Sequence, residues 1–180
     1  FANANETNKE FGSIRENGCS KFSSVTSLAL SEIKKMGVTH VWYTGVIRHA
    51  SCTSYAKYGL FADNAQVVKG QAGSPYAIKD YYDVDPDLAT NVKSRMKEFE
   101  AMLDRTHKAG LKTIIDFVPN HVGREYGSLG FSHPEFPVIG SDDDPTVHWK
   151  PENDFYYYPA EGLTLAVESG YVEMPAKASG

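Results

Sequence analysis

The sequence predicts an α/β protein, and three observations support this fold class. An amphipathic helical pattern that ends in glycine occurs twice, before Gly37 and before Gly110. An apolar, strand-like segment follows each glycine, at residues 38–43 and 111–118. These segments are nearly continuous apolar runs, which is typical of a parallel sheet covered on both faces. Repetition of helix, glycine and strand therefore indicates β/α units.

The first unit begins in residues 25–36, where apolar side chains recur at the spacing of one helical face. These residues are Val25, Leu28, Ala29, Ile33 and Met36. Gly37 follows at the position expected just beyond a helix end. Residues 38–43 are then predicted to form a strand, because they are rich in β-branched and aromatic side chains.

The second unit has the same order and ends in polar side chains. Its helical face consists of Val92, Met96, Phe99, Leu103 and Thr106, and Gly110 follows the helix. The strand predicted at 111–118 contains Asp116 and leads into Asn120 and His121. In a parallel α/β architecture, polar residues at the carboxyl end of a strand lie where ligands bind. This end of the strand is therefore the predicted site.

The remaining segments are predicted to be irregular. Residues 1–22 are polar, and residues 47–90 form a long segment with several glycines and prolines, which is expected to be a functional loop. Arg48 and His49 directly follow the first strand and are expected near the pocket, without an assigned reaction. No third β/α unit follows His121. The run at 142–144 is predicted to be a solvated acidic loop, and the aromatic run at 155–158 to be local core or an outer sugar platform.

Composition excludes several classes of protein. The 180 residues are 41% hydrophobic and carry a net charge of −5 without a basic block, so nucleic acid is not an expected partner. No apolar run approaches the roughly 20 residues of a membrane span. The chain starts at Phe1 without a visible targeting segment, so the compartment stays open, with extracellular or periplasmic preferred to cytoplasmic. For Cys19 and Cys52, two free thiols are preferred to a disulfide.

Two sequence elements carry a resemblance to a known family. The first is GSPYAIKDYYDVDP at residues 73–86, and the second, about thirty residues later, is IDFVPNH at residues 115–121. Together with the IKKMGVTHVW unit at 33–42, they closely resemble the N-terminal part of the α-amylase family, glycoside hydrolase family 13. The resemblance implies a partial TIM (β/α)8 barrel, with strands two and three at the predicted strands. Residues 1–121 would be barrel, and residues 122–180 would begin a domain inserted after the third strand.

The same resemblance implies roles for five residues. Tyr76 would be an aromatic platform for the sugar and His121 would hydrogen-bond it, while ordinary loop packing and helix capping or core packing are their alternatives. Asp116 would lie beneath the sugar site as a structural residue, and Asp80 would hold the loop that contains Tyr76. Asn120 would offer its carbonyl oxygen to a structural calcium ion, which accepts amide oxygens. A plain hydrogen bond from Asn120 to backbone is an equal alternative.

Catalysis is expected to need residues outside this chain. Retaining glycosidases use two carboxyl groups about 5–5.5 Å apart, and the resemblance places these on strands four and five, beyond Gly180. The chain is thus expected to be an inactive fragment of a retaining hydrolase that acts on α-glucosidic bonds of starch-like or maltodextrin-like substrates by double displacement. A transglycosylase or isomerase of the same family, and a non-catalytic binding or partner protein, remain as alternatives. An α-glucan is the expected partner, and the oligomeric state stays open.

Overall fold

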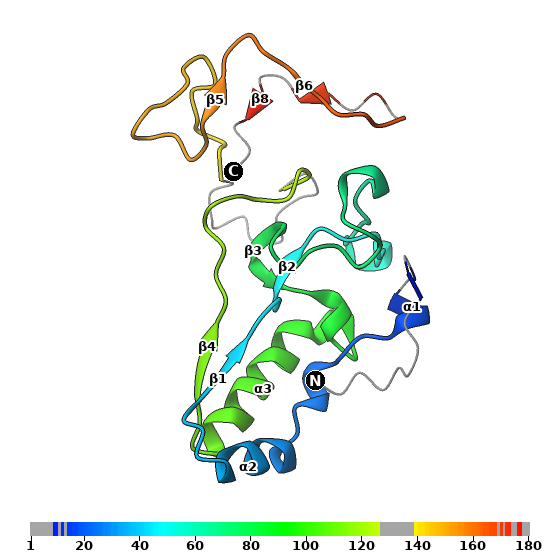
Figure 1. The fold of residues 1–180 in the computed structure, drawn as a ribbon, viewed down its shortest axis with the longest axis vertical. Coiled ribbons are helices and arrows are strands. Elements are labelled where there is room, and N and C mark those ends of the chain that lie inside the picture. Colours follow the sequence, from blue (N-terminus) through cyan, green and yellow to red (C-terminus); the bar gives the residue numbers. More distant parts are fainter. Residues whose placement is uncertain are drawn as a thin grey trace. The chain divides into compact units, whose positions relative to one another are not determined.

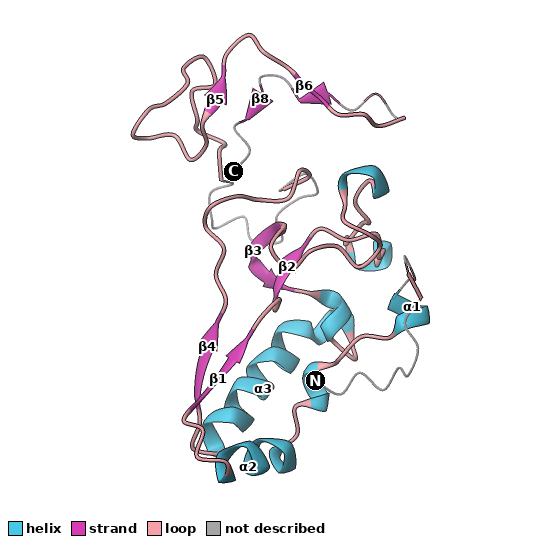
Figure 2. Cartoon of the chain, viewed as in Figure 1, coloured by secondary structure: helices cyan, strands magenta, loops and turns pink. Residues whose placement is uncertain are grey.

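The chain forms two compact units, residues 1–129 and 130–180, in a computed structural model. The structure describes residues 9–10, 12, 14–126, 139–168, 170, 172–173 and 176–177. Figure 1 labels the elements along the chain, and Figure 2 separates helices from strands by colour. The two units are described one at a time. The division at residues 121 and 122 between barrel and inserted domain remains a prediction.

A parallel pair of strands is the centre of the first unit. Strand β1 (His40–Tyr43) pairs with β4 (Lys112–Ile115), in a register that runs from His40 opposite Lys112 to Tyr43 opposite Ile115. The two arrows lie side by side in Figure 1. Parallel pairing of the two predicted strands is therefore confirmed. Both strands are shorter than predicted, since the hydrogen-bonded pairing between them includes four residues of each strand.

Two helices, both predicted, precede these strands. Helix α2 (Ser27–Lys35) begins after Thr26, whose hydroxyl accepts a hydrogen bond from the Ala29 N–H at 3.2 Å. Helix α3 (Arg95–Lys108) begins later than its apolar pattern, since a 3₁₀ turn occupies Val92–Ser94. Gly37 and Gly110 follow the helices with φ of 85° and 71°, a left-handed conformation that favours glycine. The single-turn helix α1 (Ile14–Asn17) lies in the segment predicted to be loop.

The core of the first unit lies between the two helices and one face of the strand pair. Its buried members are Phe22, Val25, Leu30, Val46, Val84, Ala89, Met102 and Leu111. Val41, Tyr43 and Ile115 pack against this core from the strands. On the opposite face Trp42 is 63% exposed and its register partner Ile114 is 45% exposed. Within the described residues the strand pair is therefore covered on one face and exposed on the other.

The segment at 47–90 contains an antiparallel strand pair, so its assignment as one long loop was wrong. Strand β2 (Ile47–His49) pairs with β3 (Ile78–Val84), with irregular register on both sides of Arg48. Short 3₁₀ turns at Ala56–Tyr58, Ala65–Val67 and Pro86–Leu88 divide the rest. The sequence did not indicate this strand pair, because β3 buries charged side chains. Strands are predicted from apolar residues on the buried face.

A hydrogen bond between β1 and α3 gives a first testable prediction. The Tyr43 hydroxyl lies 2.7 Å from the fully buried hydroxyl of Thr106, which in turn donates to the Met102 carbonyl at 2.9 Å. Replacing Tyr43 by Phe removes one partner and leaves the Thr106 donor satisfied. We expect the free energy of unfolding to fall by about 1 kcal/mol, measured by urea denaturation. An unchanged midpoint would show that this bond contributes nothing to the packing of α3.

In the described part of the second unit, the strands form two short antiparallel pairs. Strand β5 (Tyr157–Tyr158) pairs with β8 (Ala176–Lys177), and β6 (Leu163–Thr164) pairs with β7 (Val172–Glu173). In the aromatic run, Tyr157 is 4% exposed, as expected for local core, whereas Tyr156 and Tyr158 are exposed. The alternative of an outer sugar platform stays a prediction. The Asp143 carboxylate accepts from two backbone N–H groups and from the Tyr157 hydroxyl, so this acidic residue organises the unit.

Both cysteines are free thiols, as preferred from the sequence. Cys19 Sγ–H donates to the Ser20 carbonyl, and Cys52 Sγ–H donates to the Gly70 carbonyl. Among the described residues, no helix has the length and apolar character needed to cross a bilayer.

Candidate functional site

The polar residues after β4 lie at the carboxyl end of the parallel pair. Asp116 continues the ladder, because its N–H donates to the Tyr43 carbonyl at 3.2 Å, and its side chain is half-buried. Asn120 and His121 are exposed, and the Asn120 amide nitrogen lies 3.4 Å from His121 Nδ1. Asp116 therefore directly follows the last residue of β4, whereas Asn120 and His121 lie in the irregular segment beyond it. Their roles toward a sugar or a metal remain predictions.

Residues 118–123 run beside the start of β3, which brings the two predicted substrate contacts into one region. The Gly123 N–H donates to the Ile78 carbonyl at 2.6 Å. The Tyr81 hydroxyl donates to the Val118 carbonyl, and its ring packs against Phe117 at a centroid distance of 5.3 Å. Tyr76 precedes Ile78 by two residues and is 52% exposed. Backbone contacts thus place the loop at residues 70–77 (the Tyr76 loop) next to residues 118–123 (the His121 segment). The Tyr76 and His121 side chains are both open to solvent.

Gly123 permits this approach because it has no side chain. A Cβ at this position would lie 3.1 Å from the Ala77 carbonyl oxygen and 3.2 Å from that of Ile78. Contacts this short force a neighbour to move, and here both neighbours are backbone atoms. The close fit of the segment after β4 against β3 therefore depends on glycine.

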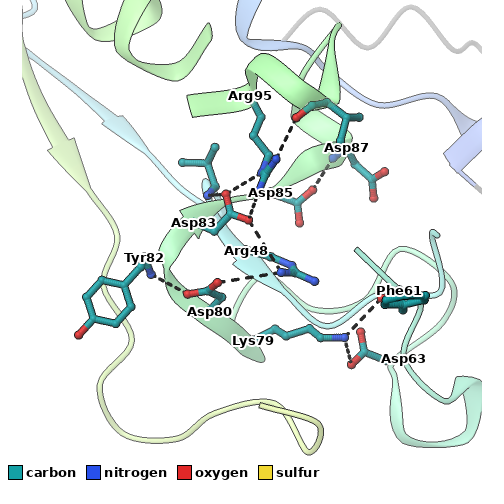
Figure 3. Close-up of polar contacts among 12 residues, drawn as sticks. Arg48, Phe61, Asp63, Lys79, Asp80, Tyr82, Asp83, Asp85, Asp87 and Arg95 are labelled. Atoms are coloured by element: carbon teal, nitrogen blue, oxygen red, sulfur yellow. Dashed lines mark hydrogen bonds and ion pairs between the residues drawn. The ribbon is translucent and has the colours of Figure 1, made fainter. Parts of the chain in front are cut away.

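A buried ionic network joins β2, β3 and the first residue of α3 (Figure 3). Arg95 donates to both oxygens of Asp83, at 2.7 and 2.8 Å. The Arg48 guanidinium lies between Asp83 and Asp80, with Nη1 at 3.8 and 4.0 Å from their carboxylates. Asp80 also accepts the Tyr82 N–H at 2.9 Å. Two guanidinium groups thus compensate two carboxylates that are at most 5% exposed.

A second buried pair joins the start of β3 to the loop before it. Lys79 is 3% exposed and places Nζ 2.7 Å from Asp63 Oδ1, while the other Asp63 oxygen accepts the Ser51 N–H at 3.0 Å. Glu125, from the segment after β4, accepts the Asn64 N–H at 3.0 Å. Burial, together with the neighbouring Asp63, raises the pKa of Glu125. These contacts join β3, the loop before it and the segment after β4.

Tyr55 and Asp87 form a third contact in this part of the chain. The Tyr55 hydroxyl donates to Asp87 Oδ1 at 2.6 Å. Burial raises the pKa of Asp87, and the neighbouring Asp85 raises it further. Burial and the Asp87 carboxylate together raise the pKa of the Tyr55 hydroxyl, which stays protonated and donates.

Comparison with known proteins assigns the family. Residues 10–162, well over half of the chain, match the family model described as the catalytic domain of alpha amylase. The chain belongs to the α-amylase family. This result confirms the resemblance based on residues 33–42, 73–86 and 115–121, and it implies a TIM barrel as the architecture of the complete catalytic domain. Among the residues that the structure describes, β1 and β4 form one parallel strand pair of such a domain.

Individual relatives of this α-amylase family chain match over shorter stretches. It is 40% identical to Maltase A1 of Drosophila melanogaster over 83 residues, 46% of the chain and 11% of the relative. It is 34% identical to Trehalose synthase of Pimelobacter over 83 residues, 46% of the chain and 12% of that protein. It is 41% identical to the amino acid transporter heavy chain SLC3A1 of Rattus norvegicus over 51 residues, 28% of the chain and 7% of the relative. The chain thus spans a small part of each curated relative.

The described residues of this family member do not fit a calcium site. Among them, no group of three or more His, Cys, Asp or Glu side chains is arranged to hold a metal ion. The Asn120 side chain has its amide nitrogen 3.4 Å from His121 Nδ1. Calcium takes six to eight oxygen ligands, so one amide is insufficient. Metal ligation by Asn120 remains a prediction that the described part of the chain does not support.

The ionic network is the part of the site that sequence analysis missed. Arg48, Asp83 and Arg95 had no assigned partner, and Asp80 was expected to support a loop instead of lying inside a strand. One signal was present: residues 80–87 contain four aspartates in a segment rich in strand-forming types. Carboxylates are rarely buried without basic partners, so this density indicates a buried network.

Proposed function

We propose that the complete protein containing this chain is a retaining glycoside hydrolase of the α-amylase family that acts on α-glucosidic bonds. One observation carries the proposal: the Tyr76 loop before β3 lies beside the His121 segment after β4. The two segments are joined by the hydrogen bond from the Gly123 N–H to the Ile78 carbonyl. Family membership supplies the sugar chemistry. Maltase A1 and Trehalose synthase among the relatives support α-linked glucose as the substrate.

The geometry suits recognition of a sugar ring. The exposed Tyr76 ring offers an apolar face for the C–H surface of a pyranose, and its hydroxyl can hydrogen-bond as well. His121 is exposed in the segment whose Gly123 contacts Ile78, and it can donate to or accept from a sugar hydroxyl. The ionic network holds β3, which begins two residues after Tyr76, and a held backbone lowers the ordering cost of binding.

The barrel proposed for the complete domain explains the exposed face of the strand pair. In a closed barrel, alternate side chains of each strand point inward and fill the interior. Trp42 and Ile114, paired in register and exposed here, would be such inward residues. A pocket of about 350 Å³, lined by apolar residues that include Phe22, Leu30 and Val41, lies beside β1 and would receive a further strand.

The chain itself is proposed to be inactive. A retaining mechanism needs a carboxylate nucleophile and a separate acid/base carboxyl group about 5–5.5 Å apart, both facing the substrate. The buried carboxylates of Asp63, Asp80 and Asp83 instead face Lys79, Arg48 and Arg95. In the complete protein, double displacement would use carboxylates supplied by later strands. No release of glucose from maltoheptaose by the purified chain is the expected result, and measurable release would contradict it.

A non-catalytic partner protein is the second candidate, and one observation favours it. Among the relatives are heavy chains of an amino acid transporter, which match 51 residues of this chain at 41% identity. A protein of that kind would need the fold without a working sugar site. A transglycosylase or isomerase, as the name Trehalose synthase suggests for that relative, stays compatible with the same site.

Sugar binding by Tyr76 is the prediction that separates these candidates. Maltoheptaose titrated into the 180-residue chain, followed by NMR, is expected to shift signals of the Tyr76 loop. Replacing Tyr76 by Ala removes the aromatic face, and we expect the affinity to fall roughly two- to tenfold, since such ring contacts contribute about 0.5–1.5 kcal/mol. Tyr76→Phe retains the face and is expected to bind within about twofold of the unchanged chain.

Tyr58→Ala is the matched control, because Tyr58 is also an exposed tyrosine in the same long segment but lies in a separate 3₁₀ turn. It is expected to leave maltoheptaose affinity unchanged. Absence of binding by the unchanged chain, or equal loss in the Tyr76 and Tyr58 variants, would count against the sugar site and in favour of the partner protein.

A further inference from the structure

His49, at the end of β2, has both ring nitrogens directed at acceptors. Nε2 lies 3.1 Å from the carbonyl oxygen of Ala72. Nδ1 lies 2.9 Å from Asp85 Oδ2, and the Ile47 carbonyl is a further acceptor beside the ring. The contact between Nδ1 and Asp85 lacks the alignment of a linear hydrogen bond, and it becomes an ion pair when the ring carries both protons. A carbonyl oxygen and a carboxylate can only accept, so both nitrogens need a proton.

A neutral imidazole cannot satisfy this arrangement. It carries one N–H, so in either tautomer a nitrogen lone pair would face an oxygen lone pair. In one tautomer the Ala72 carbonyl would lose its donor. In the other, the carboxylate of Asp85, a residue only 2% exposed, would face that lone pair instead of a positive charge. The doubly protonated imidazolium is the form that fits.

The carbonyl that His49 binds belongs to the loop leading to Tyr76. Ala72 precedes Gly73, which has φ of 78° and sits so close to Ala50 that a Cβ there would overlap the Ala50 carbonyl oxygen. His49 therefore joins three features of the chain: the end of β2, the loop carrying the proposed sugar platform, and the carboxylate that follows β3.

We infer that His49, as an imidazolium, is a positioning residue that holds the Tyr76 loop near Asp85 through contacts to the Ala72 carbonyl and the Asp85 carboxylate. Loss of its proton breaks one of these contacts and releases the loop. The inference rests on the proposed function only for the use made of Tyr76. Its geometry and its test need no sugar, so failure of sugar binding and failure of the His49 contacts can be told apart.

The charges around His49 support this assignment. Asp85 is the charged group that faces the ring; Arg48 on the same strand faces Asp80 and Asp83, and Asp87 accepts from Tyr55. Burial by itself lowers the pKa of His49, but Asp85 and the backbone carbonyls of Ala72 and Ile47 outweigh it, so the pKa is raised.

The direction of the pH effect follows from that shift. A histidine with a folded pKa above the ordinary value of about 6.5 stabilises the fold fully below that value. The contribution is lost as pH rises through the folded pKa, because the proton then leaves and the Asp85 carboxylate loses its positive partner. We therefore expect the Tyr76 loop to be most firmly held on the acidic side of that pKa.

NMR of the histidine ring nitrogens in the ¹⁵N-labelled 180-residue chain tests the inference. The His49 signals, assigned by their loss in His49→Gln, are expected to show the doubly protonated ring in excess at pH 6.5 and a midpoint above that of an ordinary histidine. Backbone amide signals of Gly73 and Tyr76 are expected to titrate with the same midpoint. A neutral His49 at pH 6.5, or loop amides that do not follow its titration, would overturn the inference.

Asp85→Asn provides the second variant, since the amide oxygen can still accept the Asp87 N–H that Asp85 Oδ1 accepts at 2.8 Å. It is expected to lower the His49 midpoint. Asp104→Asn is the matched control, because it removes an exposed carboxylate paired with Lys108 on α3. An equal midpoint in the Asp85 variant and the unchanged chain would contradict a contact through Asp85.

Discussion

Replacing Asp83 by Ala is expected to lower the free energy of unfolding of the first unit by about 3–5 kcal/mol. Asp83 is 4% exposed and accepts two hydrogen bonds from Arg95, while Arg48 lies 3.8 Å away. The substitution leaves the buried Arg48 guanidinium with one distant carboxylate and removes the bidentate partner of Arg95. An uncompensated buried charge is far more costly than a missing surface pair, because water cannot reach it.

Urea denaturation followed by circular dichroism at the helical band measures this loss. All the helices that the structure describes lie between residues 14 and 108, so the signal reports on the first unit. Asp104→Asn is the control, because its pair with Lys108 is exposed and should contribute about 0.5 kcal/mol or less. If Asp83→Ala proves insoluble, Asp83→Asn keeps the shape and tests the charge alone. Similar losses in the Asp83 and Asp104 variants would refute a buried network.

Replacing Gly73 by Ala is expected to destabilise the first unit by roughly 3 kcal/mol and to displace the Tyr76 loop. The left-handed φ of 78° costs about 1–2 kcal/mol for a residue with a Cβ. In addition, the new Cβ would lie 1.8 Å from the Ala50 carbonyl oxygen, a backbone atom that cannot rotate away. Overpacking of this kind costs about 1–3 kcal/mol.

Gly70→Ala separates these two contributions. Gly70 lies in the same loop with φ of 65°, but nothing lies within 4 Å of the position where its Cβ would be. It should therefore show only the conformational cost of about 1–2 kcal/mol. The urea midpoint and the amide spectrum of the Tyr76 loop compare the two variants. Equal destabilisation by both would show that the approach of Gly73 to Ala50 is not close in solution.

The sequence by itself determined the two β/α units, because their signals are local. Apolar spacing sets a helix face, and Gly37 and Gly110 mark the helix ends where a left-handed residue is needed. The polar end of the second strand could also be predicted, since Asp116 interrupts an apolar run at a defined place. The family followed from two short elements and their spacing, and the family match over residues 10–162 confirmed it.

Only the tertiary structure decided which charges meet. Arg48, Asp83 and Arg95 are far enough apart in sequence that no periodicity links them, and their pairing depends on the irregular register between β2 and β3. The same holds for His49, whose two acceptors come from the Tyr76 loop and from the end of β3. Side-chain partners across a fold are set by packing, whereas helix and strand patterns are set by neighbours in the chain. For this reason the sequence predicts a site after the second strand, and the tertiary structure shows how the backbone around it is held.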